Sequence, residues 1–310
     1  MNNRNVRGGA IMLIGVAAFA LMDVGMKILA PAYSPLQIAA VRCFSSLPLI
    51  LVWIALRGGF RRIHHVRWGL HALRAAIGIV MLASFVYGIR HLPLAEAYTI
   101  FFVAPLLITA FAAVILGERV EWQRWAAIVA GLAGVAIVLR PTGAGVISLA
   151  GLAVVVCAVG YALSAILVRI LGRTDSTESM VLWLMILMGA GAALLALPQW
   201  RAIQPQHWIV IAGIGVTGCL GQWALTEAFR MGEASYIAPF EYSALAWGLT
   251  FDWILWRSIP GGRALAGAAV IVASGIYLIR RERSAGEESL QPLSHEGSAH
   301  VPPVDVRRSS

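Results

Sequence analysis

Long apolar runs alternate with short polar connections along the whole chain. About 20 apolar residues are needed to cross the hydrocarbon core of a bilayer as a helix, because only internal hydrogen bonds satisfy the backbone there. The runs predict ten transmembrane helices, at residues 9–30, 35–56, 69–89, 94–116, 125–139, 146–168, 180–198, 207–229, 235–256 and 264–279. The remaining segment, residues 284–310, is polar and aperiodic, and we expect a disordered tail there. The pattern predicts an all-α polytopic membrane protein.

Composition and charge agree with this class. Hydrophobic residues make up 59% of the chain and charged residues only 13%, whereas a soluble domain has about 25% charged residues. With the N-terminus in the cytoplasm, 14 arginines lie in cytoplasmic segments and five in external ones. The positive-inside rule then favours two cytoplasmic termini. The net charge of +9 is therefore a feature of topology, and no nucleic-acid partner is expected.

The two halves of the chain resemble each other. Residues 9–29 align with residues 151–171, an offset of 142, and Phe19 then matches Tyr161. Each half has five predicted spans, an odd number, so the second half must insert in the opposite orientation. Inverted repeats are typical of secondary transporters, whose site lies near the midplane between the halves. The predicted parts are a cytoplasmic N-terminus at 1–8, a first repeat at 9–140, a second repeat at 146–281 and a cytoplasmic tail.

Several motifs carry a family resemblance. The fourth span contains Pro105 and ends in the turn Leu116-Gly117-Glu118, and a small-residue fifth span ends at Pro141. With the five-plus-five organisation, the chain resembles the EamA-type branch of the drug/metabolite transporter superfamily over about residues 8–282. The second half has Leu255-Trp256-Arg257-Ser258 in place of the acidic turn. The resemblance implies export of amino acids and other small metabolites.

Ionisable residues inside the spans cost about 2.5–3.5 kcal/mol each on insertion scales, so each needs a partner, a route to the headgroups or a wet cavity. The sequence contains eight, which form an outer and an inner layer around an uncharged middle. The outer layer is Asp23, Lys27, Arg42, Glu96 and Asp252, and the inner layer is Arg74, Glu227 and Glu241.

Six of these eight residues are the candidates for gating or coupling: Asp23, Lys27, Arg42, Arg74, Glu227 and Glu241. Asp23 and Lys27 are four residues apart and can pair along one helix face. An ion pair within the helix and an outer gate that includes Arg42 both fit this spacing. Arg74 and Glu227 can instead reach the interface. Glu241 lies deeper in its span and is the strongest candidate for an inner gate or a titrating carboxylate.

Aromatic and small polar residues dominate the middle layer. The expected lining of a central cavity is Phe19, Tyr98, Phe101, Tyr161, Ser164, Gln222, Trp223, Tyr242 and Ser243. Pro105 and Pro239 are expected to break their helices and free backbone carbonyls, which transporters use to hold polar solute groups. The sequence thus predicts an electrically neutral site.

The function expected is alternating-access export of small amphipathic metabolites, most simply amino acids, including aromatic or hydrophobic ones. Export of drugs or organic cations is the alternative, and a channel or an intramembrane enzyme is more remote. No catalytic residue, metal site or cofactor is expected, because the spans contain no nucleophile–base pair or metal-binding spacing. Cys43, Cys157 and Cys219 lie in apolar runs and are expected to be structural thiols. Besides solute and lipid no partner is expected, and the chain can act as a monomer or a homodimer.

Overall fold

A computed structural model describes residues 3–56, 66–117, 148–231 and 238–258, with scattered positions between 122 and 133 and between 261 and 273. The described residues form helices and no strands. The α-helices are α1 (Asn3–Leu29), α2 (Pro35–Leu56), α3 (Trp68–His91), α4 (Leu94–Phe101), α5 (Ala104–Leu116), α7 (Leu149–Leu171), α8 (Thr177–Ala196), α9 (Trp208–Met231) and α11 (Ser243–Trp256). Three short 3-10 helices join them: η2 (Leu197–Gln199), η3 (Pro205–His207) and η4 (Ala238–Tyr242).

Seven helical segments of the described chain are long and apolar enough to cross a membrane. They are Arg7–Leu29, Pro35–Leu56, Trp68–His91, Leu94–Leu116, Leu149–Val168, Glu178–Gln199 and Pro205–Leu225. These coincide with seven predicted spans. The predicted spans at 125–139 and 264–279 and the predicted tail fall largely or wholly outside the described residues, and the span at 235–256 is described from residue 238 onward.

Helix ends follow local chemistry. The side chain of Ser148 accepts a hydrogen bond from the Gly151 amide at the start of α7, which caps that helix. At the end of α5, Gly117 adopts a left-handed conformation with φ 69°. Glycine reaches this region without steric cost, which explains the glycine in the Leu116-Gly117-Glu118 turn. Arg257 ends α11 in the same conformation, with φ 53°, so the left-handed turn is retained in the second half although the glycine is not.

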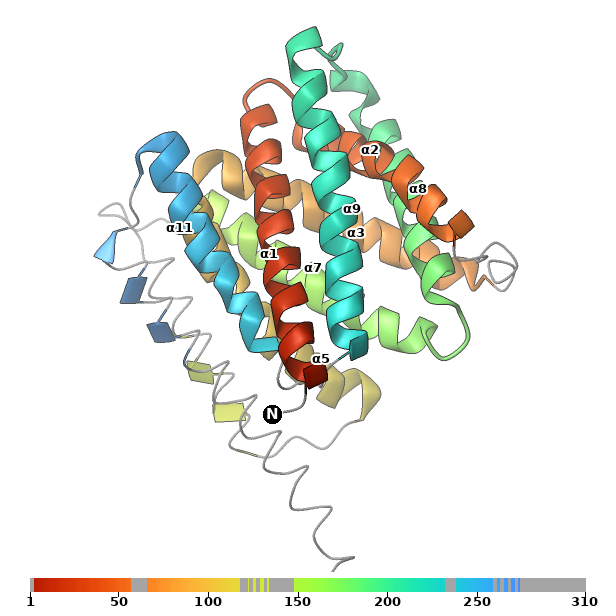
Figure 1. The fold of residues 1–310 in the computed structure, drawn as a ribbon, viewed down its shortest axis with the longest axis vertical. Helices are drawn as coiled ribbons and strands as arrows, with labels where there is room; N and C mark the ends of the chain where they lie inside the picture. Colours follow the sequence, from red (N-terminus) through yellow and green to blue (C-terminus); the bar gives the residue numbers. More distant parts are fainter. Residues whose placement is uncertain are drawn as a thin grey trace, which may run out of the picture.

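Three helix pairs make the most extensive contacts. α1 lies along α9, α3 along α7, and α2 against α8 (Figure 1). In the α1–α9 pair close approach depends on a small residue, because a Cβ atom on Gly15 of α1 would lie 2.9 Å from the Cβ of Ala224 of α9. Each pair joins a helix from residues 3–91 to one from residues 149–231, so the most extensive helix contacts of the described residues lie between the two halves of the chain.

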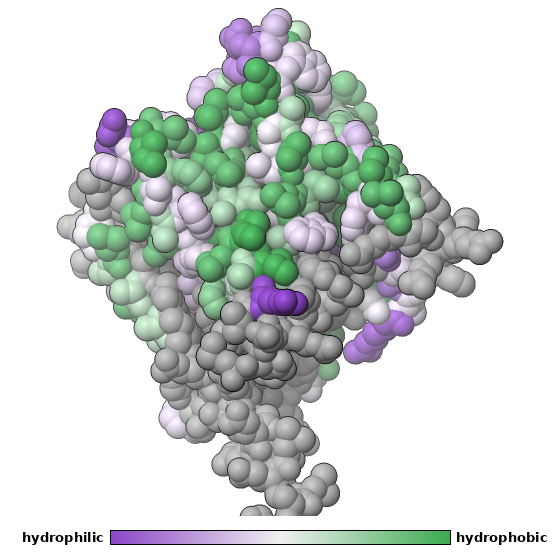
Figure 2. Space-filling view, viewed as in Figure 1, coloured by the Kyte–Doolittle hydropathy of each residue, from purple (hydrophilic) through white to green (hydrophobic). Residues whose placement is uncertain are grey.

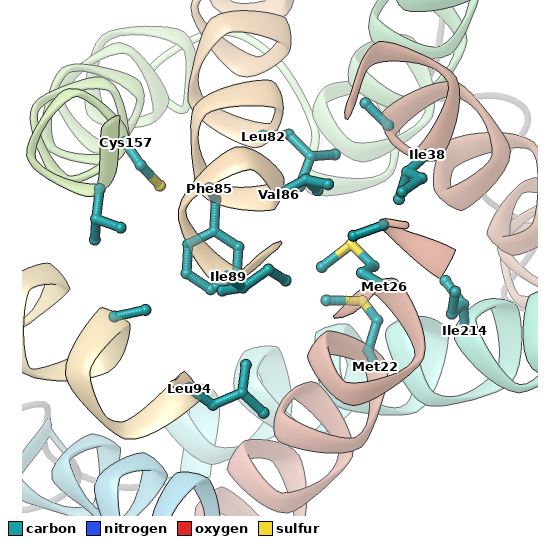
Figure 3. Close-up of a cluster of buried hydrophobic side chains, with 14 of the residues drawn as sticks. Met22, Met26, Ile38, Leu82, Phe85, Val86, Ile89, Leu94, Cys157 and Ile214 are labelled. Carbon is teal, nitrogen blue, oxygen red and sulfur yellow. The ribbon is translucent and has the colours of Figure 1, made fainter. Parts of the chain in front are cut away.

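The main hydrophobic core lies where these pairs meet. Figure 3 shows Met22 and Met26 of α1 near Ile38 of α2 and Ile214 of α9, with Phe85 of α3 close by. The outside is also apolar, with exposed leucines and valines on most helices, and Figure 2 shows mainly hydrophobic residues over α1, α9 and α11. A contiguous apolar exterior is expected where lipid replaces water as the solvent.

Candidate functional site

A cavity of about 310 Å³ lies between the helices of the two halves. Six of the nine methionines of the chain line it. They come from α1, α3 and α8 and are Met12, Met22, Met26, Met81, Met185 and Met188. Methionine is unbranched and polarisable, so its side chain adapts to ligands of different shape and contacts aromatic rings favourably. These methionines could not be recognised as cavity residues from the sequence, because apolar helices carry methionine for packing as well.

Aromatic rings form one wall of the cavity. Phe85 stacks on Tyr98 with ring centroids 6.4 Å apart. Phe85 also meets Phe101 edge-on at 6.3 Å, and Phe101 meets Tyr161 at 5.2 Å. Offset and edge-to-face arrangements are the favourable ones for aromatic pairs. The four rings come from α3, α4 and α7, so the wall joins the two halves.

Among the described residues, four side chains of acidic or basic residues also line the cavity: Asp23, Arg42, Arg74 and Glu241. This corrects the expectation of a neutral central site. Counting residues from the ends of the spans assigned these groups to separate outer and inner layers. The tertiary structure turns all four toward one continuous space. The cavity can therefore interact with a solute through charge as well as through apolar contact.

One end of the cavity lies near the C-terminus of α1, and we call it the Lys27 end. There the Tyr98 hydroxyl donates a hydrogen bond of 2.7 Å to Asp23, which is buried. Arg42 is close enough to Asp23 to interact with it electrostatically. The Nε of Arg42 donates to the sulfur of Met22 at 3.2 Å. The carboxylate at this end therefore has both a hydrogen-bond donor and a nearby cation.

Lys27 pairs with Asp252 of α11 and not with Asp23, which corrects the predicted pairing within α1. Its Nζ lies 3.1 Å from Asp252 Oδ1 and also donates to the Leu92 carbonyl oxygen at 3.1 Å. The other oxygen of Asp252 accepts from the Ala95 amide at 2.9 Å. The ammonium lies 4.5 Å from the centroid of the Trp256 ring. These five residues, the Lys27 cluster, connect α1, α4 and α11 beside the cavity.

Loop contacts lie at the same end of the bundle. Gln37 of α2 exchanges two hydrogen bonds with the backbone of Arg201, at 2.6 and 3.1 Å. Tyr33 forms a 2.8 Å hydrogen bond with His207 and accepts one from the Gln204 amide at 2.9 Å. The connection after α1 is therefore tied to the connection after α8, which reinforces the link between the halves at the Lys27 end.

The opposite end contains Arg74, and we call it the Arg74 end. Leu92 follows Arg74 by 18 residues, which is about 27 Å at the rise of an α-helix. The Arg74 Nε donates to the Ser164 hydroxyl of α7 at 3.3 Å, and its Nη1 donates to the Met180 carbonyl of α8 at 3.2 Å. Arg74 thus points across the helix interface and into the cavity, and it does not extend along its own helix to the membrane surface.

A buried histidine–aspartate pair lies one turn from Arg74. His71 Nε2 is 2.7 Å from Asp175 Oδ2, in the connection between α7 and α8. Burial by itself raises the pKa of the Asp175 carboxyl. Hydrogen bonds from Thr174, from His71 and from the Arg67 backbone amide, together with the charge of the imidazole, outweigh that effect and hold the pKa below its ordinary value. Asp175 is therefore ionised at neutral pH, and it anchors the start of α3 to the second half.

The structure brings six of the nine predicted lining residues to the cavity: Phe19, Tyr98, Phe101, Tyr161, Ser164 and Gln222. Trp223 lies elsewhere, 40% exposed, in a separate groove of about 280 Å³ on the outside of α2, α8 and α9. Gln222 borders both spaces, and the helical rotation of about 100° per residue leaves Trp223 in the groove alone. Tyr242 packs edge-on against Phe102 at 5.0 Å, and Ser243 follows it at the start of α11. Neither of these two residues lines the cavity.

The remaining predicted residues concern the helix breaks and one carboxylate. The fourth span is interrupted at Phe102 and Val103, between α4 and α5, immediately before the turn of helix that contains Pro105. Pro239 lies in η4, which leads into α11. The side chains of Pro105, Pro239 and Glu227 lie outside the described residues. Of the three cysteines, Cys43 and Cys157 are buried and Cys219 is intermediate.

Comparison with known proteins identifies the family. The model of the EamA-like transporter family matches residues 6–140 and, a second time, residues 148–281. The chain belongs to this family. As an EamA-like transporter it is a multi-pass protein of the bacterial inner membrane and a transporter of small molecules, not an enzyme. The two matches divide the chain close to the boundary predicted from the internal repeat.

Relatives of this EamA-like transporter are named for different solutes. The chain is 28% identical to a riboflavin transporter of Vibrio cholerae, over 89% of this chain and 94% of the relative. It is 25% identical to a pseudopaline exporter of Pseudomonas aeruginosa, over 88% and 96%. It is also 25% identical to an S-adenosylmethionine uptake transporter of Rickettsia bellii, over 88% and 93%. One solved structure, 20% identical, covers 88% of this chain and 98% of its own with a TM-score of 0.61, a likeness of fold alone.

Proposed function

We propose that this protein is a secondary transporter that moves small amphipathic metabolites by alternating access between two inverted five-helix halves, with both termini in the cytoplasm. The observation that carries the proposal is a single cavity between the halves that combines aromatic rings, methionines and charges of both signs. Such a lining suits a solute with an apolar body and polar ends. Pore-lining surfaces of channels, by contrast, need only weak contacts that let the permeant leave quickly.

The pattern of helix contacts supports two equivalent halves. The sequence repeat relates α1 to α7 and α3 to α9, because residues 9–29 align with residues 151–171. The α1–α9 contact then corresponds to the α7–α3 contact, and these are the two most extensive contacts of the fold. A reciprocal exchange of this kind is expected for halves related by a two-fold axis, and an odd number of spans in each half would make them inverted.

In this topology the Lys27 end faces the outside of the cell and the Arg74 end faces the cytoplasm. The Lys27 cluster and the loop contacts of Gln37 and Tyr33 then close the external side. Alternating access requires these contacts to separate when the cavity opens outward. Lys27 and Asp252 act as an external gate, a role that fits their position beside the cavity and their origin in opposite halves.

The substrate class follows from the lining. Amino acids, above all aromatic or hydrophobic ones, match a cavity with aromatic and methionine walls and charged groups of both signs. The names of the relatives widen the panel to riboflavin and S-adenosylmethionine, each of which joins a ring system to polar groups. Export is the direction that we propose, although the named relatives include both an exporter and an uptake transporter. Drugs and organic cations are the second candidate class, favoured by the buried carboxylate of Asp23.

A transport assay with purified protein tests the proposal. Proteoliposomes loaded with phenylalanine, tryptophan, riboflavin, S-adenosylmethionine or tetraphenylphosphonium are assayed for uptake of the same labelled solute. We expect saturable flux of at least one amphipathic solute and faster uptake when the same solute is present inside. Flux that neither saturates nor shows trans-stimulation would identify a channel. The absence of flux for the whole panel would overturn the proposed substrate class.

Energy coupling can be tested in the same vesicles. If transport is proton-coupled, a carboxylate in the cavity must take up and release the proton, and among the described residues Asp23 and Glu241 line it. A pH gradient should then drive accumulation in the wild type and fail to do so in Asp23→Asn or Glu241→Gln. Unchanged pH dependence in the double variant would indicate facilitated diffusion instead.

A further inference from the structure

The four charges of the cavity are not equally compensated. Asp23 is hydrogen-bonded by Tyr98 and lies near Arg42, so that cation has a carboxylate close to it. Arg74 has none among the described residues. Of their carboxylates, Asp252 pairs with Lys27, and Asp175 is hydrogen-bonded to His71. Glu241 lines the same cavity and forms no ion pair with Arg74.

The partners of Arg74 are both neutral. They are the hydroxyl of Ser164 and the backbone carbonyl of Met180. A guanidinium has five N–H donors in a rigid plane, so these two contacts leave three donors available. The same two contacts also hold the side chain in one orientation. A cation that is fixed in place with donors to spare is suited to bidentate recognition of a carboxylate.

We propose that Arg74 binds the carboxylate of the transported solute, which makes the Arg74 end of the cavity an anion subsite. A charge within a membrane-spanning segment is costly unless it is paired, and no partner from the described chain neutralises this one. A solute carboxylate supplies the missing charge. The apolar body of the solute then lies against Met81, Met185 and the rings of Phe101 and Tyr161, which line the same cavity.

This inference rests on the proposed function but can fail independently of it. The probes are phenylalanine and phenylalaninamide, which share the ring and the ammonium group and differ in the carboxylate. Indole-3-acetate and its amide form a second pair that lacks the ammonium group. Binding to the purified full-length protein in detergent is measured as the rise in unfolding temperature with ligand concentration, and flux of the same probes is measured in proteoliposomes.

The variants are Arg74→Gln, Arg74→Lys and, as a matched control, Arg173→Gln. Arg173 is exposed in the connection between α7 and α8, so its change removes a positive charge from the same end without touching the cavity. In the wild type and in Arg173→Gln we expect each carboxylate to bind at least tenfold more tightly than its amide. Arg74→Gln should abolish that preference and leave amide binding within twofold. Arg74→Lys should restore it in part, because lysine keeps the charge and loses the planar fork.

Each outcome decides the proposal. Unchanged amide binding in Arg74→Gln shows that the variant is folded, so loss of carboxylate preference there supports the anion subsite. Equal weakening of carboxylate and amide would show a structural role for Arg74 and overturn it. A wild type without any preference for carboxylates would overturn it as well. Carboxylate binding that depends on Arg74 without any flux would instead count against the proposed transport function and leave the subsite standing.

Discussion

The two ends of the cavity solve the problem of buried charge in different ways. At the Lys27 end the buried charges have protein partners: Lys27 meets Asp252, and Asp23 meets Tyr98 and lies near Arg42. At the Arg74 end the described partners of the guanidinium are both neutral. The neighbouring carboxylate of Asp175 forms its contact with His71 instead. One end pairs its buried charges, and at the other the described residues give the Arg74 cation no ion-pair partner.

This difference suggests a division of labour. A complete network of buried pairs holds two elements together and is costly to break by removing one member, about 3–5 kcal/mol. That property suits a gate, which must be stable when closed. An incomplete site gains most when a ligand completes it, which suits recognition. The free-energy cost of an unpaired buried charge thus stabilises the closed gate at one end. At the other end the same cost favours binding of a ligand with the opposite charge.

The largest expected effect comes from breaking the Lys27 cluster. Asp252→Asn removes a fully buried charge that accepts from both Lys27 and the Ala95 amide. We expect a loss of about 3 kcal/mol from the closed state and therefore at least tenfold faster modification of Cys157 by a membrane-impermeant thiol reagent added outside. Cys157 lines the cavity and is buried in this structure, so it reports external opening.

The control for this experiment is Cys157→Ser in the same background, which should remove the accelerated labelling. Cys219 lies in the groove outside the cavity and should label equally in both proteins. Lower thermal stability of Asp252→Asn without faster labelling of Cys157 would mean that the Lys27 cluster is a packing contact and not a gate.

A smaller effect is expected at the other end from Asp175→Asn. The pKa of this carboxyl is lowered in the folded protein. Its ionised form therefore stabilises the fold above the ordinary pKa of about 3.9, and the stabilisation is lost as pH falls through the lowered value. We expect Asp175→Asn to lower the free energy of unfolding by about 1–2 kcal/mol at pH 7, since a charged hydrogen bond is lost.

The measurement is thermal unfolding in detergent between pH 3 and pH 7. The difference between the wild type and Asp175→Asn should shrink as the pH falls. Glu178→Gln removes a carboxylate from the first turn of the following helix and serves as the control. A constant difference across the pH range would contradict the ionic contribution of Asp175.

The smallest effect concerns the two left-handed turns, one at the end of α5 and one at the end of α11. Gly117 and Arg257 adopt the same conformation, but only glycine does so without steric cost. We expect Arg257→Gly to raise the free energy of unfolding by about 0.5 kcal/mol and Gly117→Ala to lower it by about 1 kcal/mol. Thermal unfolding measures both. A destabilised Arg257→Gly would show that the contact of Arg257 with the Trp253 ring, 6.0 Å away, outweighs the backbone cost.

Much of the fold could be predicted from the chain alone. Apolar runs of bilayer length located the seven spans of the described residues to within a few positions, because hydrophobic length is a local property. The family was predicted from motifs such as the Leu116-Gly117-Glu118 turn, and the family match confirms it. Six aromatic and polar residues that line the cavity could also be predicted, because their position within a span is a local property of the sequence.

Other predictions required knowledge of what each face of a helix meets. Asp23 and Lys27 share a face of α1, and spacing alone favoured a pair between them. In the folded protein Asp23 accepts a hydrogen bond from Tyr98 of α4, and Lys27 forms an ion pair with Asp252 of α11. Partners more than 70 positions away cannot be read from helical periodicity, which is why the pairing of Asp23 with Lys27 was a wrong prediction.

The sequence by itself determined that this is a polytopic helical membrane protein with a duplicated organisation. The length of the apolar runs and the similarity of the two halves can both be read directly from the order of the residues. The tertiary structure alone decided which charges face one another. Helix rotation and the packing of one half against the other assign Asp252 to Lys27 and give Arg74 only neutral partners. Electrostatic energy depends on distances across the fold, and those distances exist only after the helices have packed.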